Sequence, residues 1–232
     1  MQSTLFDKIQ DLNQDVFRNI VSLAKSQDLF DDLYENTDGS DKIAQIAEAR
    51  VKMQIPGDML SRGFHYTTAI EYPFHTENFH ATRFGDGSYP CWYAATDLKT
   101  SVYETAYHTM RDLLNADIKE IVIRERAVYK IHCRGLLIDL THKNIEYPDL
   151  INKSNYVFTQ AIGKRIYTEG HPGLITNSAR LIKGENSVLF KQDVLNNPRV
   201  SSYLTYKCDA KNSEVFVYKY GSQQVLYTYR LD

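Results

Sequence analysis

The fold of this chain is decided by residues 83–106, which read RFGDGSYPCWYAATDLKTSVYETA. The cluster of turn-forming residues from Gly85 to Ser88 predicts a turn. The apolar and aromatic run from Cys91 to Ala95 has the length of a buried strand. Thr96, Asp97 and Thr100 are residues that cap helices, and the apolar spacing after them predicts a helix ending near Asn115. A turn, a strand and a helix therefore follow one another closely.

Three side chains in this stretch are candidates for chemistry, namely Arg83, Tyr93 and Glu104. Glu104 falls in the first turns of the predicted helix, where the helix dipole favours an anion by a few tenths to about 1 kcal/mol. A sheet could bring these groups, and Ser178 from a later turn, around one cleft. Each also has an ordinary structural explanation, as a surface ion pair, a core aromatic, a helix-start charge or a turn residue.

Composition limits the classes of protein. The chain has 232 residues, of which 43% are hydrophobic and 24% charged, which suits one large domain or one domain with an appendage. The net charge of −2 argues against a protein that binds nucleic acid in bulk. The three cysteines are widely spaced, no signal-peptide pattern begins the chain, and no apolar run has the length of a membrane span. We expect a cytoplasmic protein that does not contact a membrane.

The beginning of the chain differs in pattern from the rest. Apolar residues recur at steps of three and four over residues 3–35, which predicts a helix, and a second helix is expected over 42–52. We therefore divide the chain into an N-terminal helical extension, 1–60, and a main domain, 61–232. The extension could cover a sheet edge, bind a partner or form a homodimer interface.

The main domain has mostly strand-like periods with inserted helices, which is typical of an α+β fold with a mixed sheet. A helix is expected from Tyr156 to Tyr167, ending at Gly170. Strands are expected at 64–74, 118–131, 136–140, 173–180 and 187–191, with a turn or bulge at Gly135 and a C-terminal hairpin over 215–231 around Gly221.

The sequence lacks the motifs that mark several common kinds of metal, nucleotide-binding and catalytic site. The seven histidines form no HExxH or paired Cys/His spacing, so no metal site is expected. The chain has no P-loop, no GxGxxG after a strand, and no GxSxG elbow around Ser178. Nothing places a histidine beside a cysteine nucleophile.

In order, the remaining motifs resemble those of the RES-domain toxins, the toxin half of the RES–Xre toxin–antitoxin systems. The family pattern is an arginine in an RF-type segment, a tyrosine in a YxA strand, a glutamate opening the next helix, and a serine after a glycine-led strand. Here these are Arg83-Phe84, Tyr93-Ala94-Ala95, Glu104 in TSVYE and Ser178 in GLITNS, followed by a VLF strand at 188–190. The resemblance covers roughly residues 64–194. The glycine pattern around Arg83 departs from that of many members, and Arg62 is a second candidate for the same role.

This resemblance implies an ADP-ribosyltransferase-like fold that binds NAD and cleaves its nicotinamide–ribose bond. It implies that Glu104 is catalytic, that Arg83 and Tyr93 bind NAD and take part in catalysis, and that Ser178 helps to bind NAD. It also implies an Xre-type antitoxin as partner. The acceptor stays open between water, phosphate and a protein. A protein ADP-ribosyltransferase and a non-catalytic nucleotide- or protein-binding module are the alternatives.

Overall fold

The computed structural model describes residues 4–22 and 67–231, and the expected helix at 42–52 and Arg62 lie outside them. The described strands form one mixed sheet with the order β1-β2-β5-β4-β3-β6-β7-β8. They are β1 (Ile9–Val21), β2 (Trp92–Ala95), β3 (Ile121–Asp139), β4 (Gly173–Asn177), β5 (Glu185–Leu189), β6 (Leu195–Asp209), β7 (Glu214–Lys219) and β8 (Val225–Arg230). The α+β class is therefore confirmed.

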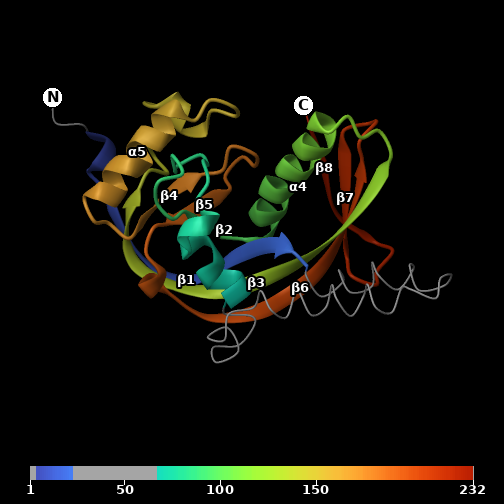
Figure 1. The fold of residues 1–232 in the computed structure, drawn as a ribbon, viewed down its shortest axis with the longest axis horizontal. Helices are drawn as coiled ribbons and strands as arrows, with labels where there is room; N and C mark the ends of the chain where they lie inside the picture. The colour runs from blue at the N-terminus through green and yellow to red at the C-terminus, as the bar shows by residue number, and fades with distance from the viewer. Residues whose placement is uncertain (1–3, 23–66, 232) are drawn as a thin grey trace.

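The sheet is closed on one side and open on the other. β1 pairs with β3 along its whole length and with β2 at Phe17 and Ala95, so β1, β2, β5, β4 and β3 form a ring. β6, β7 and β8 extend the sheet away from this ring through β3. Only the β3–β4 pairing is parallel among the described strands. Figure 1 shows β1, β3 and β6 as long, curved strands below α4, α5, β4 and β5.

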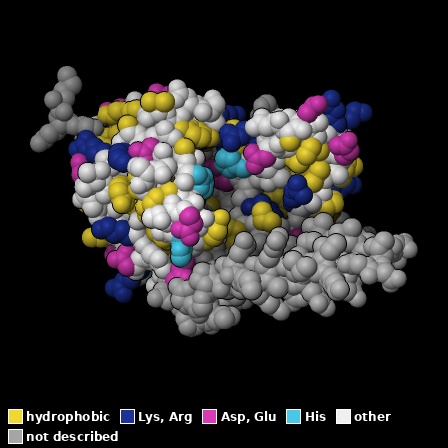
Figure 2. All heavy atoms as spheres, in the orientation of Figure 1, with side chains coloured by type: hydrophobic (Ala, Val, Ile, Leu, Met, Phe, Trp, Pro, Cys, Tyr) yellow, Lys and Arg dark blue, Asp and Glu magenta, His cyan; other side chains and the backbone are white. Residues whose placement is uncertain are grey.

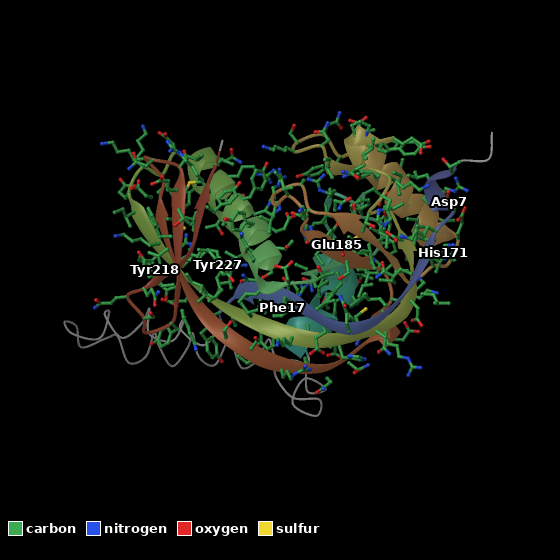
Figure 3. The ribbon with its side chains drawn as sticks, turned by 180° about the vertical axis from the view of Figure 1, so that it is seen from behind. Asp7, Phe17, His171, Glu185, Tyr218 and Tyr227 are labelled. Atoms are coloured by element: carbon green, nitrogen blue, oxygen red, sulfur yellow. The ribbon has the colours of Figure 1, made fainter. Side chains whose placement is uncertain are left out.

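Among the described residues, two α-helices cover this sheet, α4 (Leu98–Asn115) and α5 (Val157–Thr168). α4 packs on the β6–β8 half through a buried stripe, and α5 packs beside β4 at the other end (Figure 1). Figure 3 places Phe17 on β1 and Glu185 on β5 in the middle, with Tyr218 and Tyr227 at one end and Asp7 and His171 at the other. Short 3₁₀ helices occupy Thr4–Phe6, Tyr72–Phe74, Thr76–Asn78, Pro148–Ile151 and Gln192–Val194.

The expected helix over residues 3–35 is wrong where the structure describes it. Leu12, Val16 and Ile20 are spaced by four, and a step of four returns to the same face in a strand as well as in a helix. Ile9, which a helical stripe would bury, is 55% exposed. Pairing with thirteen consecutive β3 residues selects the strand. The start of the chain is therefore part of the main sheet, not of a separate helical extension.

Two further expectations are corrected. Thr67 to Glu71 forms a π-helical turn instead of the strand expected over 64–74, and the carbonyl of Ala69 accepts a hydrogen bond from the Trp92 indole at 2.9 Å. Gly135 does not separate two strands, because β3 continues through it from Ile121 to Asp139. A Cβ at Gly135 would lie 3.0 Å from the Val194 side chain, so the glycine serves close packing.

The local predictions around α4 and α5 are confirmed. Asp97 caps α4, its carboxylate accepting from the backbone N–H of Thr100 at 2.8 Å. α5 ends before Gly170, which adopts a φ of +83°. β7 and β8 form the expected antiparallel C-terminal hairpin. No helix among the described residues is long and apolar enough to cross a membrane.

Candidate functional site

Glu104 is presented by the second turn of α4. Its neighbours Val102 and Ala106 are fully buried in the core beneath the helix, so Glu104 emerges from the helix toward the ring strands. Its carboxylate oxygen Oε1 accepts two hydrogen bonds, from Ser178 Oγ at 2.6 Å and from Asn186 Nδ2 at 2.7 Å. Helix α4, strand β5 and the turn after β4 therefore meet at a single carboxylate oxygen.

The direction of the Ser178–Glu104 hydrogen bond is fixed by the loop around the serine. Ser178 Oγ accepts from the backbone N–H groups of Arg180 and Leu181, both at 3.0 Å. Its remaining capacity is one proton, which it donates to Glu104. The serine is 7% exposed. It orders its own turn and aligns the carboxylate at the same time.

Arg83 lies in the turn before β2. Its Nη1 donates to the carbonyl of Asn152 at 2.7 Å, and its guanidinium stacks on the Tyr156 ring at 4.7 Å. Burial lowers the pKa of Arg83; Tyr156 raises it, the charge of Arg180 lowers it and Glu104 raises it. The structure thus brings Arg83 into the electrostatic neighbourhood of Glu104, and Nε and Nη2 of Arg83 donate to no described residue.

The Arg83 turn is held rigidly from two sides. The Tyr93 hydroxyl accepts from the Phe84 N–H and donates to Thr82 Oγ1, both at 2.9 Å. Burial raises the pKa of Tyr93 well above its usual range. On the other side, a Cβ at Gly163 of α5 would lie 1.9 Å from the Phe84 carbonyl oxygen, so only glycine permits this approach.

A cavity of about 300 Å³ opens beside Glu104. Its walls come from β1, β2, α4 and the segment before Arg83, and they include Tyr93 and Asn186. Arg83 and Ser178 do not line it, although Ser178 contacts Glu104, which does. Figure 2 shows a hollow between the end of the molecule that carries α4 and the end that carries α5, with histidine side chains around it. His80 and His108 are the histidines in the lining.

Arg18 on β1 is a cation in the cavity wall that sequence reasoning missed. Its Nη1 donates to the carbonyl of Tyr93 at 2.9 Å, and its guanidinium lies 4.9 Å from the centre of the Trp92 ring. Its Nε is buried and has no hydrogen-bond partner within residues 4–22 and 67–231, and burial lowers the pKa of Arg18 to about 10. No signal near Arg18 could have found it, because it reaches the cavity only through the strand that was expected to be a helix.

Arg180 is a second cation that was missed. Its guanidinium stacks on the Tyr107 ring at 3.3 Å, and its Nη2 donates to the Lys153 carbonyl at 2.8 Å and to the Tyr156 hydroxyl at 3.2 Å. Tyr156 therefore contacts Arg83 with its ring and Arg180 with its hydroxyl. The pKa of His108 is lowered to about 4, by desolvation and then by the charges of Arg180 and other arginines.

The donor set at this site suits an anionic ligand. Of the four groups predicted from the sequence, Tyr93 and Glu104 line the cavity and Ser178 binds Glu104. Arg83 lies outside the lining, in the turn that the Tyr93 hydroxyl holds at Phe84. No group of three His, Cys, Asp or Glu side chains within residues 4–22 and 67–231 could hold a metal ion. The fold and the site define an α+β protein whose cavity is lined, among the described residues, by one carboxylate, Glu104, and one arginine, Arg18.

Comparison with known proteins gives the family. The model of the RES domain matches residues 59–209, and the chain therefore belongs to the RES domain family. A chain of the crystal structure of the M. tuberculosis MbcT–MbcA toxin–antitoxin complex is similar, with a TM-score of 0.45 and 11% sequence identity, over 83% of this chain and 86% of that chain. No curated protein matches.

Proposed function

We propose that this RES-domain protein is an NAD-consuming enzyme that cleaves the bond between nicotinamide and ribose. The observation that carries the proposal is the geometry of Glu104. Its Oε1 is held by Ser178 and Asn186, while its Oε2 accepts no hydrogen bond from any described residue and the side chain lines the cavity. A fixed carboxylate with one open oxygen is suited to stabilise developing positive charge.

Cleavage of the nicotinamide–ribose bond needs a group that stabilises positive charge. Loss of nicotinamide leaves a ribose with oxocarbenium character, as in the hydrolysis of glycosides. Glu104 would stabilise this cation or hold the ribose hydroxyl groups, and a positioned charge of this kind contributes on the order of 3 kcal/mol, about a hundredfold in rate. The carboxylate is already oriented, so little reorganisation is needed when charge develops.

Arg83, Tyr93 and Ser178 have different roles in the proposal. Arg83 lies outside the cavity lining; its Nη1 is held by the Leu150 and Asn152 carbonyls, and its Nε and Nη2, which donate to no described residue, would bind a pyrophosphate oxygen of an NAD molecule that extends beyond the cavity. The hydroxyl of Tyr93 is committed to Thr82 and Phe84, so its contact with nicotinamide would be made by the ring. Ser178 acts on NAD through Glu104. An ADP-ribosyltransferase-like fold is part of this proposal.

Transfer of ADP-ribose to a protein is the less well supported alternative. Transferases often carry a second acid two residues before the key glutamate, and here Val102 occupies that position with its side chain buried in the core. We therefore favour water or phosphate as acceptor. The resemblance to the RES–Xre systems supports the further proposal that the protein is a toxin restrained by an Xre-type antitoxin.

The acceptor is tested by analysing the products of NAD with the purified chain, with and without phosphate. Free ADP-ribose in both conditions indicates hydrolysis, and a phosphorylated ADP-ribose formed only with phosphate indicates phosphorolysis. ADP-ribose attached to added protein, without either free product, would replace both with transfer. NAD that is bound but not consumed in any condition would favour the binding module.

A further inference from the structure

Asn186 contacts the proposed catalytic carboxylate but belongs to none of the motifs that identified the site. It lies on β5 between two neighbouring strands, its Cα paired with Ala95 of β2 and with Thr176 of β4. Its backbone is therefore fixed from both sides. From this rigid position the side chain reaches across to α4 and donates to Glu104 Oε1 at 2.7 Å.

The two donors to Glu104 differ in how they are anchored. Ser178 sits in a turn whose backbone N–H groups it also binds, whereas Asn186 sits in the middle of the sheet. Both donate to Oε1 and neither donates to Oε2. With two donors on one oxygen, rotation of the carboxylate about its final torsion would break both hydrogen bonds. The plane of the carboxylate, and the oxygen that it leaves open, are fixed by this pair.

We propose that Asn186 is a positioning residue, which holds Glu104 so that Oε2 is the oxygen offered to the ligand. The proposal rests on the function proposed above, because the value of the orientation lies in the reaction at that oxygen. Asn186 itself acts through Glu104. The prediction is specific to the donor N–H of the amide, which aspartate lacks at nearly the same size.

The test uses a reciprocal exchange of donor and acceptor. In Asn186→Asp, two carboxylates face each other, so we expect a lower thermal midpoint and a fall in kcat for nicotinamide release of at least tenfold, with a smaller change in KM. In the double variant Asn186→Asp with Glu104→Gln, the new glutamine amide can donate to the new aspartate. We expect the thermal midpoint to recover, whereas nicotinamide release does not, because the carboxylate now lies on β5.

The matched control is Asn196→Asp, the same chemical change at an exposed position on β6, for which we expect wild-type kcat and thermal midpoint. Wild-type kcat and KM in Asn186→Asp, or a double variant that is as unstable as the two single changes add up to, would overturn the proposal. Failure of the proposed function is seen separately, as wild-type protein that does not consume NAD. In that case the thermal midpoints of the single and double variants alone decide whether Asn186 and Glu104 are coupled.

Discussion

Ser178 Oγ lies 2.6 Å from Glu104 Oε1, although the two residues are 74 positions apart in the sequence. The serine hydroxyl also accepts from two backbone N–H groups of its own turn. One small side chain thus links the conformation of the loop after β4 to the orientation of a carboxylate on α4. The loop and the carboxylate should respond together when the serine is changed.

Ser178→Ala should reduce both stability and activity. The change removes one donor from Glu104 and leaves the N–H groups of Arg180 and Leu181 without their acceptor, so we expect the free energy of unfolding to fall by about 1–3 kcal/mol. Nicotinamide release should fall as well. Denaturant unfolding and a rate assay measure the two effects. Ser154→Ala, at an exposed serine, is the control, and equal effects of both changes would refute the linkage.

Gly163→Ala should displace the turn that carries Arg83. The new methyl group would lie 1.9 Å from the Phe84 carbonyl oxygen, a separation that forces α5 and the turn apart. We expect a loss of stability of about 1–3 kcal/mol and weaker NAD binding. Ala161→Ser, at an exposed position of the same helix, should have little effect. Unchanged thermal midpoint and NAD affinity in Gly163→Ala would contradict this packing.

Arg18→Gln should weaken NAD binding more than it weakens the fold. Glutamine can still donate to the Tyr93 carbonyl, but the cavity loses a cation whose buried Nε has no partner among the residues that the structure describes. Because charge-assisted hydrogen bonds to anions are strong, we expect the dissociation constant for NAD to rise by roughly tenfold or more. Isothermal titration measures it. Arg134→Gln, at an exposed position of β3, should bind like wild type.

The cysteines should react slowly in the folded protein. Burial raises the pKa of the Cys91 and Cys133 thiols to about 12 and that of Cys208 to about 11. The reactive thiolate is therefore scarce at pH 8, and we expect alkylation by iodoacetamide roughly a hundredfold slower than in urea. Mass spectrometry of quenched samples follows each site. Equal rates for folded and unfolded protein would be inconsistent with these shifts.

The same shifts set a direction for alkaline stability. Above about pH 9 the thiols of the unfolded chain lose their protons while those of the folded chain keep them, up to about pH 11–12. The folded state then binds more protons, so the free energy of unfolding should fall as pH rises through this window. Cys133→Val, at a buried position of β3, should reduce that dependence, whereas an unchanged slope would exclude Cys133 as a contributor.

Local sequence signals predicted the elements that local chemistry determines. The Asp97 cap, the end of α5 at Gly170 and the short strand at Trp92 all depend on residues within a few positions of one another. β1 could not be predicted in this way, because its spacing of four fits both helix and strand and its paired residues on β3 lie 105 to 129 positions further on, from Val21 with Arg126 to Ile9 with Ile138. β6 was missed because Asn197-Pro198 interrupts it, which the sheet accommodates at a register shift opposite β3.

The same distinction applies to the site. Glu104 and Arg83 stand in recognisable order along the chain, so a family pattern found them. Arg18 and Asn186 have no such context, and they reach the site only because β1 and β5 take their places in the ring. Long-range strand pairing therefore supplied what the sequence could not indicate.

The role of Glu104 in cleaving NAD is best tested by the rate of nicotinamide release from NAD by the purified chain, beside Glu104→Gln and Arg83→Ala. Glutamine retains an oxygen that can accept from Ser178 and Asn186, so Glu104→Gln should stay folded. We expect release by the wild type and a fall of about a hundredfold or more in Glu104→Gln. Full-rate release by folded Glu104→Gln, or no release by wild-type protein that binds NAD, would contradict this expectation.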